Sequence, residues 1–262
     1  MSAIGFFETG GLKLRAAPAR DACFRLVLSD SEMETFEGTG VLARRESVHR
    51  HMANEITSLD IAAQCLVEFP DAPWGLRMEL ARQCWDESRH VAGLARRLGE
   101  MGGTKGEFPI SVFEWSITCA IDNLPGRLAA QNRTFEAGAM DVVGGNITAW
   151  REAGDGATAD LLEAILADEI QHVRFANRWL KKIAEQDRRV LLKLAMAVRW
   201  VAQVNAMVAQ LSPGSAELSG SAAPAVNVED RRLAEFSDDE IHEILKQAGF
   251  RSLVPESSPA SR

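Results

Sequence analysis

The chain has 262 residues, of which 46% are hydrophobic and 25% charged, a balance typical of a globular protein with one large or two small domains. Its net charge of -8 argues against a general nucleic-acid or membrane-surface binder, because both favour a basic face. The sequence shows no run of 18 apolar residues and no signal peptide, so we expect a cytoplasmic protein without a membrane span. None of the four cysteines forms a C-x-x-C pair, which favours reduced thiols.

Residues 1–45 are expected to form an irregular N-terminal segment. Within it, the sequence FFETGGLKL is typical of a short hairpin that turns at Gly10 and Gly11. Residues 21–34 suit a strand as well as a helix, and we assign them to neither.

A helical period begins at Ser47 and recurs as far as Leu211. Pro73 is a favourable first-turn residue, and Pro125 marks either a kink or a helix start. The connection before Pro125 is expected to be long and irregular. Apolar residues at steps of three and four predict helices at about 47–69, 73–99, 124–152, 157–184 and 187–211. We therefore expect an all-α fold whose helical domain covers residues 46–211.

The composition changes after Leu211. Residues 212–227 are rich in Ser, Ala, Gly and Pro, which predicts a flexible linker. Residues 228–262 are expected to form a helical tail, in which Ser237 caps a short helix with acidic residues in its first turn.

One polar motif, Asp-Glu-x-x-His-Val, occurs twice, at residues 86–91 and again at residues 168–173. A lone helical glutamate precedes each copy. Glu55 lies 32 residues before the glutamate of the first copy, and Glu136 lies 33 residues before that of the second. The two halves of the domain therefore repeat one polar pattern, which predicts two similar helix hairpins.

The spacing of the motif predicts a shared site. Glutamate and histidine at i and i+3 lie on one face of a helix, about one turn apart. If the two hairpins pack antiparallel, the lone glutamates of the other two helices reach the same space. The candidate metal ligands are then four carboxylates and two imidazoles, Glu55, Glu87, His90, Glu136, Glu169 and His172.

Bare charge would not be stable at such a site, because four buried carboxylates repel one another and are costly to desolvate. Two divalent cations would neutralise them, and mixed carboxylate and imidazole ligands suit iron, manganese or zinc. The alternative is that each Glu-His pair is a solvated surface pair, which leaves the repeat without a reason.

The stretches NEITSLDIAAQCL, WDESRH, NRTFEAGAMD and ADEIQHVRFAN resemble those of ferritin-like carboxylate di-metal proteins, and most closely the bacterial ferritin-like group DUF455. The resemblance covers about residues 45–185. It implies a ferritin-like four-helix bundle, to which the tail adds further helices.

The same resemblance implies roles for the individual residues. Glu87 and Glu169 would bridge the two metals, while the lone glutamates would be more terminal ligands. Asp168 and, by the repeat, Asp86 would orient the metal-bound histidines from behind.

The other histidines are assigned by their place on the helix. His51 lies four residues before Glu55, so we expect it to support that carboxylate, with an additional ligand or a proton relay as alternatives. Its counterpart in the second half is Asn132. His49 and His242 are expected to face solvent.

Several polar residues near the motifs are expected to miss the metals. Asp60 and Asp141 lie about 140° around their helices from the lone glutamates and are expected to bond an arginine or a neighbouring helix. Trp85 and Cys84 are expected in the core. The arginines nearest the site either pair with acids or meet an anionic substrate, namely Arg89, Arg133 and Arg174.

These residues predict an O2-dependent oxygenase or oxidase with two iron ions, or alternatively an Mn/Fe or two-Mn centre, acting on a small organic or peptide-derived substrate. We expect an electron donor, whose identity the sequence does not indicate, and a homodimer is compatible with the pattern. A ferroxidase or metal-storage protein is the alternative function, and metals that only staple the helices are a third. Because the sequence has no tyrosine, a stored tyrosyl radical is excluded.

Overall fold

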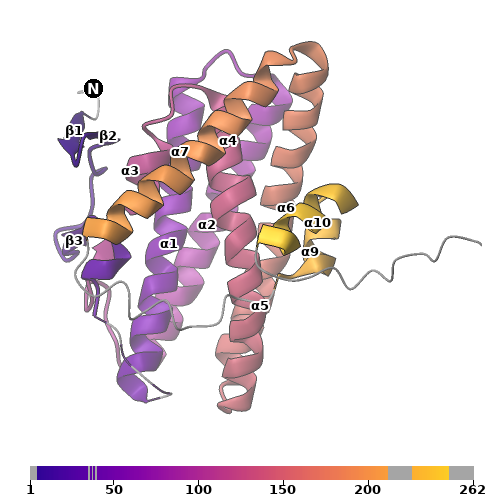
Figure 1. Cartoon of the computed structure of the whole chain (residues 1–262). Helices are drawn as coiled ribbons and strands as arrows, with labels where there is room; N and C mark the ends of the chain where they lie inside the picture. Colours follow the sequence, from indigo (N-terminus) through magenta and orange to yellow (C-terminus); the bar gives the residue numbers. More distant parts are fainter. Residues whose placement is uncertain (1–4, 35, 37, 39, 212–225, 248–262) are drawn as a thin grey trace, which may run out of the picture.

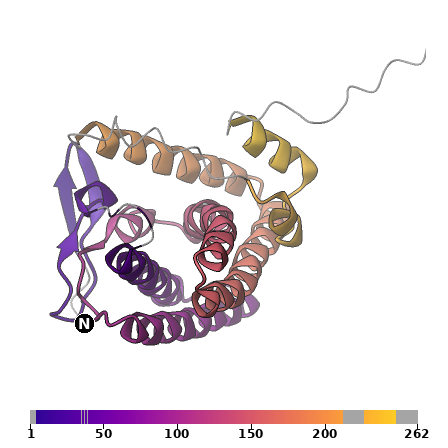
Figure 2. The same cartoon turned by 90° about the horizontal axis from the view of Figure 1, so that it is seen from below.

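The computed structural model describes residues 5–34, 36, 38, 40–211 and 226–247, and most of them are helical, which confirms the all-α class. The first hairpin consists of α1 (Val41–Glu68) and α2 (Trp74–Glu100). The second consists of one long helical segment and α6 (Gly156–Gln186). The two hairpins meet where α2 packs against α6, and the long helices lie side by side (Figures 1 and 2).

The first hairpin has the boundaries that its prolines dictate. Phe69 ends α1 before Pro70, which has no N–H to donate, and Pro73 stands immediately before α2. The start of α1 differs from the prediction, because the helix already begins at Val41. Residues 41–46, VLARRE, contain good helix formers that extend it toward the N-terminus.

The long helical segment of the second hairpin changes its winding halfway. Asn123 caps its first part by accepting the N–H of Gly126 at 2.9 Å, so Leu124–Pro125 is a start and not a kink. The middle is a π-helical turn, in which the Thr134 hydroxyl donates to the Ala129 carbonyl at 2.9 Å. Such turns are frequent at functional sites, and this one ends at the site's lone glutamate. The three parts are α4 (Leu124–Ala130), η2 (Gln131–Glu136) and α5 (Ala137–Glu152).

The N-terminal segment contains the predicted hairpin. Strands β1 (Phe6–Thr9) and β2 (Leu12–Arg15) pair antiparallel, and Gly10 and Gly11 turn the chain with φ of +55° and +78°. The rest of the N-terminal segment and the chain between α2 and α4 also contain short elements that the sequence did not reveal, since elements of two to six residues leave no periodic pattern. These elements are β3 (Leu26–Val27), η1 (Asp30–Glu32), β4 (Ile110–Ser111), which pairs parallel with β3, and α3 (Phe113–Thr118).

Three further helices cover the domain. Helix α7 (Arg189–Leu211) crosses α4, while α9 (Val228–Leu233) contacts α6 and is followed by α10 (Asp238–Gln247). At the start of α10, Glu240 accepts the N–H of Ser237 at 2.8 Å and donates its own N–H to the Ser237 hydroxyl at 3.3 Å, which confirms the predicted cap. Residues 212–225 of the expected linker and 248–262 of the expected tail lie outside the described residues.

Two apolar layers stand above and below the level of the repeated motif. One contains Leu76 and Leu80 at the start of α2 with Phe175 and Leu180 of α6. The other contains the C-terminal part of α2 with the N-terminal part of α6, the start of α1 and the middle of α5. The motif residues are therefore enclosed along the helix axes by packed hydrophobic side chains.

Candidate metal centre

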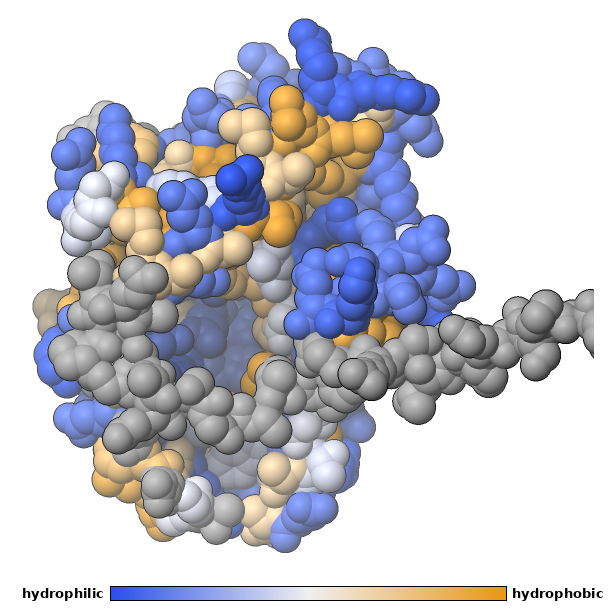
Figure 3. Space-filling model, viewed as in Figure 1, coloured by the Kyte–Doolittle hydropathy of each residue, from blue (hydrophilic) through white to orange (hydrophobic). Residues whose placement is uncertain are grey.

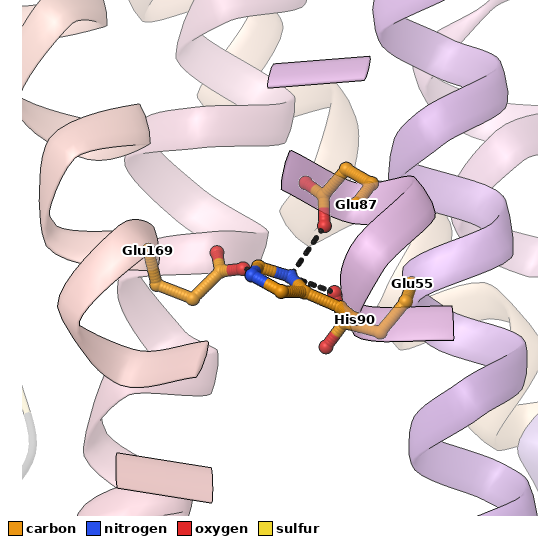
Figure 4. A group of neighbouring side chains, drawn as sticks. All are labelled: Glu55, Glu87, His90 and Glu169. Carbon is orange, nitrogen blue, oxygen red and sulfur yellow. Dashed lines mark hydrogen bonds and ion pairs between the residues drawn. The ribbon is translucent and has the colours of Figure 1, made fainter. Parts of the chain in front are cut away.

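The structure brings all six candidate ligands together at the middle of the long helices. Each is at most 6% exposed. Figure 4 shows four of them, with the His90 ring between the carboxylates of α1, α2 and α6. The six come from four helical segments: Glu55 from α1, Glu87 and His90 from α2, Glu136 from η2, and Glu169 and His172 from α6.

Their donor atoms form two overlapping groups, and within each group the atoms lie within 4.8 Å of one another. Glu87 and Glu169 belong to both groups, as two shared carboxylates would. Each group could hold a metal ion. The first comprises Glu55, Glu87, His90 and Glu169, and the second Glu87, Glu136, Glu169 and His172.

The His90 ring is held from two sides. Its Nδ1 lies 3.1 Å from Glu55 Oε2 and 3.1 Å from Glu87 Oε2. Its Nε2 lies 3.2 Å from Oδ2 of Asp168, which belongs to the opposite helix. Burial disfavours charge on this ring, but Glu55 and Glu87 outweigh it and raise the pKa of His90 to about 11.

His172 is held in the equivalent way by the aspartate of the other motif. Its Nε2 lies 3.3 Å from Oδ2 of Asp86. Burial favours the neutral form of Asp86, yet hydrogen bonds from His172 and Arg89 outweigh it and hold the Asp86 pKa well below its ordinary value. Each motif therefore supplies the aspartate that orients the other motif's histidine, and Arg89 also bonds Asp168 at 2.9 Å.

The remaining nitrogen of His172 tests whether a metal fits. Its Nδ1 is buried, makes no hydrogen bond to any described residue, and faces Glu87 Oε1 at 3.4 Å. Buried polar atoms are rarely left without a partner. When Nε2 carries the proton that Asp86 accepts, Nδ1 presents its lone pair to the carboxylate cluster, the orientation that a metal ligand requires. The residues present therefore fit a metal ion.

The carboxylates show the same need for positive charge. Burial, together with the charges of Glu169 and Glu55, raises the pKa of Glu87 well above its ordinary value. Burial and the charge of Glu169 raise the pKa of Glu136 to about 8. Burial acts on Glu55 too, but hydrogen bonds from His51 and His90 outweigh it and lower the Glu55 pKa. A cluster of four buried carboxyl groups is suited to divalent cations, which would neutralise their charge.

Both lone glutamates are supported from the residue four positions earlier. His51 Nε2 contacts Glu55 Oε1 at 2.8 Å, and the Asn132 amide donates to Glu136 Oε2 at 2.8 Å. Sequence reasoning missed a third supporting residue, Gln83, whose amide donates to Glu136 and, at 3.3 Å, to Glu87. Its position four residues before Glu87 was the available signal.

A cavity of about 290 Å³ reaches the cluster from the side of α1 and α5. Glu55, Glu136 and Glu169 line its inner end, and Figure 3 shows this side hollowed and hydrophilic within. The cavity is also lined by Glu114 of α3, which sequence reasoning missed. Burial, reinforced by nearby carboxylates, raises the Glu114 pKa to about 8 although Gln131 bonds it.

Two of the remaining assignments are wrong. His49 is fully buried and accepts the N–H of Gly106 at 3.0 Å, because the chain after α2 folds back over this face of α1 and covers it. Trp85 is 65% exposed, since the apolar stripe of α2 passes on the other side of the helix. Cys84 packs against the core as expected, and His242 is exposed.

The other polar residues form ion pairs, as predicted. Asp60 pairs with Arg20, and Asp141 pairs with Arg231 at 2.6 Å. The three arginines near the motifs all meet acidic partners: Arg89 pairs with Asp86 and Asp168, Arg133 with Glu240, and Arg174 with Glu235.

Fold and site together define an all-α protein with a buried glutamate and histidine cluster that could hold metal ions. The chain matches the family described as "Protein of unknown function (DUF455)" over residues 7–242 and so belongs to it. No curated protein and no solved structure matches the chain.

Proposed function

We propose that the chain is a ferritin-like di-iron protein that acts as an O2-dependent oxygenase or oxidase on a small organic or peptide-derived substrate. The observation that carries the proposal is a pair of overlapping donor groups directly beside a cavity. Carboxylates from every long helix with one histidine per hairpin form the ligand set of di-iron and di-manganese bundle proteins.

In the proposed centre, Glu55 and His90 would hold one ion, and Glu136 and His172 would hold the other. Glu87 and Glu169 belong to both donor groups and would contribute to both ions. When bound, two irons supply a redox-active centre for O2 and electrons.

The chain's own residues then orient and protect that centre. Asp86 and Asp168 face Nε2 of the opposite histidine, so that Nδ1 of each ring is turned toward the carboxylates that would hold the same ion. The two apolar layers exclude water along the helix axes.

Substrate would approach from the cavity of about 290 Å³, because three of the six candidate ligands line it. The smaller pocket between α2 and α6, of about 160 Å³, is lined by His172 alone among the six. The outer walls of the larger cavity combine amide groups with apolar side chains, a lining that suits a small molecule with both polar and apolar parts. These walls include Asn54, Asn146, Phe135 and Val142.

A ferroxidase or metal-handling protein is the second candidate, and Glu114 is the observation that favours it. This carboxyl lines the cavity together with three of the site glutamates. Four carboxyl groups on the walls of one cavity would also provide oxygen ligands for a cation on its way to the centre.

Metal analysis followed by O2 consumption separates the candidates. We expect two iron ions per chain and an O2 uptake that increases when a candidate small organic or peptide-derived substrate is accepted. Iron oxidation at full rate without any substrate, in a cage-sized particle, would assign the second function instead. Tightly bound zinc without redox activity would contradict both and leave the metals a structural role.

A further inference from the structure

The outer face of α7 carries large apolar side chains that nothing in the described part of the chain covers. Leu191, Leu192 and Met196 are 55%, 65% and 62% exposed. These residues lie in the first turns of α7, and Figure 3 shows hydrophobic surface over the upper end of this helix. Exposed apolar groups gathered in this way mark an interaction surface more often than isolated ones do.

The opposite face of the same helix belongs to the core. Val201 and Val204 are buried there, and the helix packs against α4. The stretch Arg189–Met207 has a mean hydropathy of 1.3 and is only 22% buried, so by length and composition alone it could cross a membrane. Because its inner face is already packed on α4, the arrangement suits a helix that lies along a surface.

Charge is distributed very unevenly around this face. Residues 181–207 contain six basic and two acidic residues and so have a net charge of +4. Because the whole chain has a net charge of -8, all other residues together carry -12. One of the two acids, Asp187, is already paired with Arg189 at 2.8 Å. The basic side chains beside the apolar group include Arg188 and Lys193, both exposed, and Arg188 lines one pocket together with Leu191.

We propose that the outer face of α7 docks on an anionic lipid surface, with the leucines and Met196 entering the headgroup layer and the basic residues meeting lipid phosphates. Apolar side chains flanked by Lys and Arg are the composition of helices that lie in a membrane interface. The inference goes beyond the proposed function and does not depend on it.

The charge also decides between lipid and a second copy of the chain. A two-fold dimer through this face would bring residues 181–207, which carry a net charge of +4, close to the same residues of the second copy. Like charges across an interface are unfavourable, whereas an anionic bilayer complements these residues. The net charge of the whole chain hides this, because it averages one basic helix with an acidic remainder.

Sedimentation of the full chain with phospholipid vesicles tests the proposal. We expect binding to vesicles that mix phosphatidylglycerol with phosphatidylcholine, little binding to phosphatidylcholine alone, and loss of binding at high salt. Leu191→Ser with Leu192→Ser, and separately Lys193→Glu, should each weaken binding, the double variant by at least about tenfold.

Matched changes elsewhere control for general effects. Val67 is 71% exposed on α1, and Arg96 is exposed on α2, so Val67→Ser and Arg96→Glu should bind vesicles as the wild type does. No binding to anionic vesicles at low salt, or equal losses in the control variants, would overturn the proposal. A dimer in analytical ultracentrifugation that Leu191→Ser with Leu192→Ser dissociates would assign the face to a second copy.

Discussion

At the scale of single residues, each aspartate of the site contacts a histidine on the other helix. Asp86 of α2 contacts His172 of α6, while Asp168 of α6 contacts His90 of α2. Neither motif is complete alone, because each histidine takes its orientation from the other hairpin. The repeated Asp-Glu-x-x-His-Val motif is therefore a set of reciprocal contacts.

Replacing either aspartate should weaken metal binding without removing a ligand. In Asp86→Asn or Asp168→Asn, the histidine Nε2–H loses its charged acceptor, and we expect metal affinity to fall about 10- to 100-fold. Competition against a metal-binding dye measures the change. Asp160→Asn, on the exposed side of α6, should leave affinity unaltered, since Asp160 is 70% exposed and pairs with Arg151 at the surface. Equal affinity in all three variants would contradict the role of the reciprocal contacts.

Loss of a shared carboxylate should cost more. Glu87 and Glu169 each belong to both donor groups, so Glu87→Ala or Glu169→Ala should reduce the bound metal to one ion per chain or none. Elemental analysis of the purified variants gives the ratio directly. Glu163→Ala is the matched control, because Glu163 is 61% exposed on α6 and pairs with Arg151. Two ions per chain in both site variants would show that the ligand assignment is wrong.

At the scale of elements, the short segments decide where side chains end up. His49 shows this, because its burial depends on the chain around Gly106, and the helical period of α1 contains no sign of it. A matching i−4 contact was predictable for His51 from spacing within one helix. The contact of Gln83 with Glu136 and the place of Glu114 in the cavity were not, because they depend on how η2 and α3 are placed against the hairpins. The repeat predicted the six-residue cluster well because two equal halves constrain each other.

The burial of His49 has a consequence for stability against pH. Burial lowers the pKa of His49, although Glu107 opposes the shift. The unfolded chain therefore takes up this proton more readily than the folded chain, and stability falls as the pH drops through about 6.5. His49→Gln keeps an acceptor for the Gly106 N–H without titrating. We expect its free energy of unfolding to decline less than that of the wild type on acidification.

Denaturant unfolding at a series of pH values compares the two slopes. His242→Gln is the control, because that histidine is exposed and its removal should leave the wild-type slope. Parallel curves for His49→Gln and the wild type would contradict the assignment.

A buried ion pair attaches the tail to α5. Arg231 of α9 is 5% exposed, pairs with Asp141 at 2.6 Å, and donates to the Ala137 carbonyl at 3.0 Å. Arg231→Ala leaves Asp141 buried without its cation, which should cost about 3 kcal/mol and reduce amide protection in α9 about a hundredfold. The neighbouring Arg232 pairs with Asp238 in solvent, so Arg232→Ala should cost less than about 0.5 kcal/mol. Hydrogen exchange followed by mass spectrometry measures the amide protection of α9 in both variants. Similar losses of protection in Arg231→Ala and Arg232→Ala would contradict this account.

At the scale of the whole molecule, the polar cluster is the level at which all the long helices meet. Apolar layers on either side hold the helices together, while the cluster itself contributes mutual repulsion among carboxylates with raised pKa values. The two hairpins are thus joined through a layer of carboxylates that repel one another when they are ionised, so cations bound there would stabilise the contact between the hairpins. Metal binding should therefore act on the stability of the entire domain.

Adding Mn²⁺ avoids oxidation chemistry and isolates this effect. An ion that binds the folded chain at about a hundred times its dissociation constant adds about 2.7 kcal/mol, which for a chain of this size raises Tm by about 5 °C or more. Differential scanning fluorimetry should show a Tm shift that grows with Mn²⁺ concentration.

Glu163→Ala should retain this Tm shift, whereas Glu87→Ala should lose most of it. A wild-type Tm that does not respond to Mn²⁺, or a Glu87→Ala chain that responds fully, would show that the cluster is not a metal site joining the hairpins.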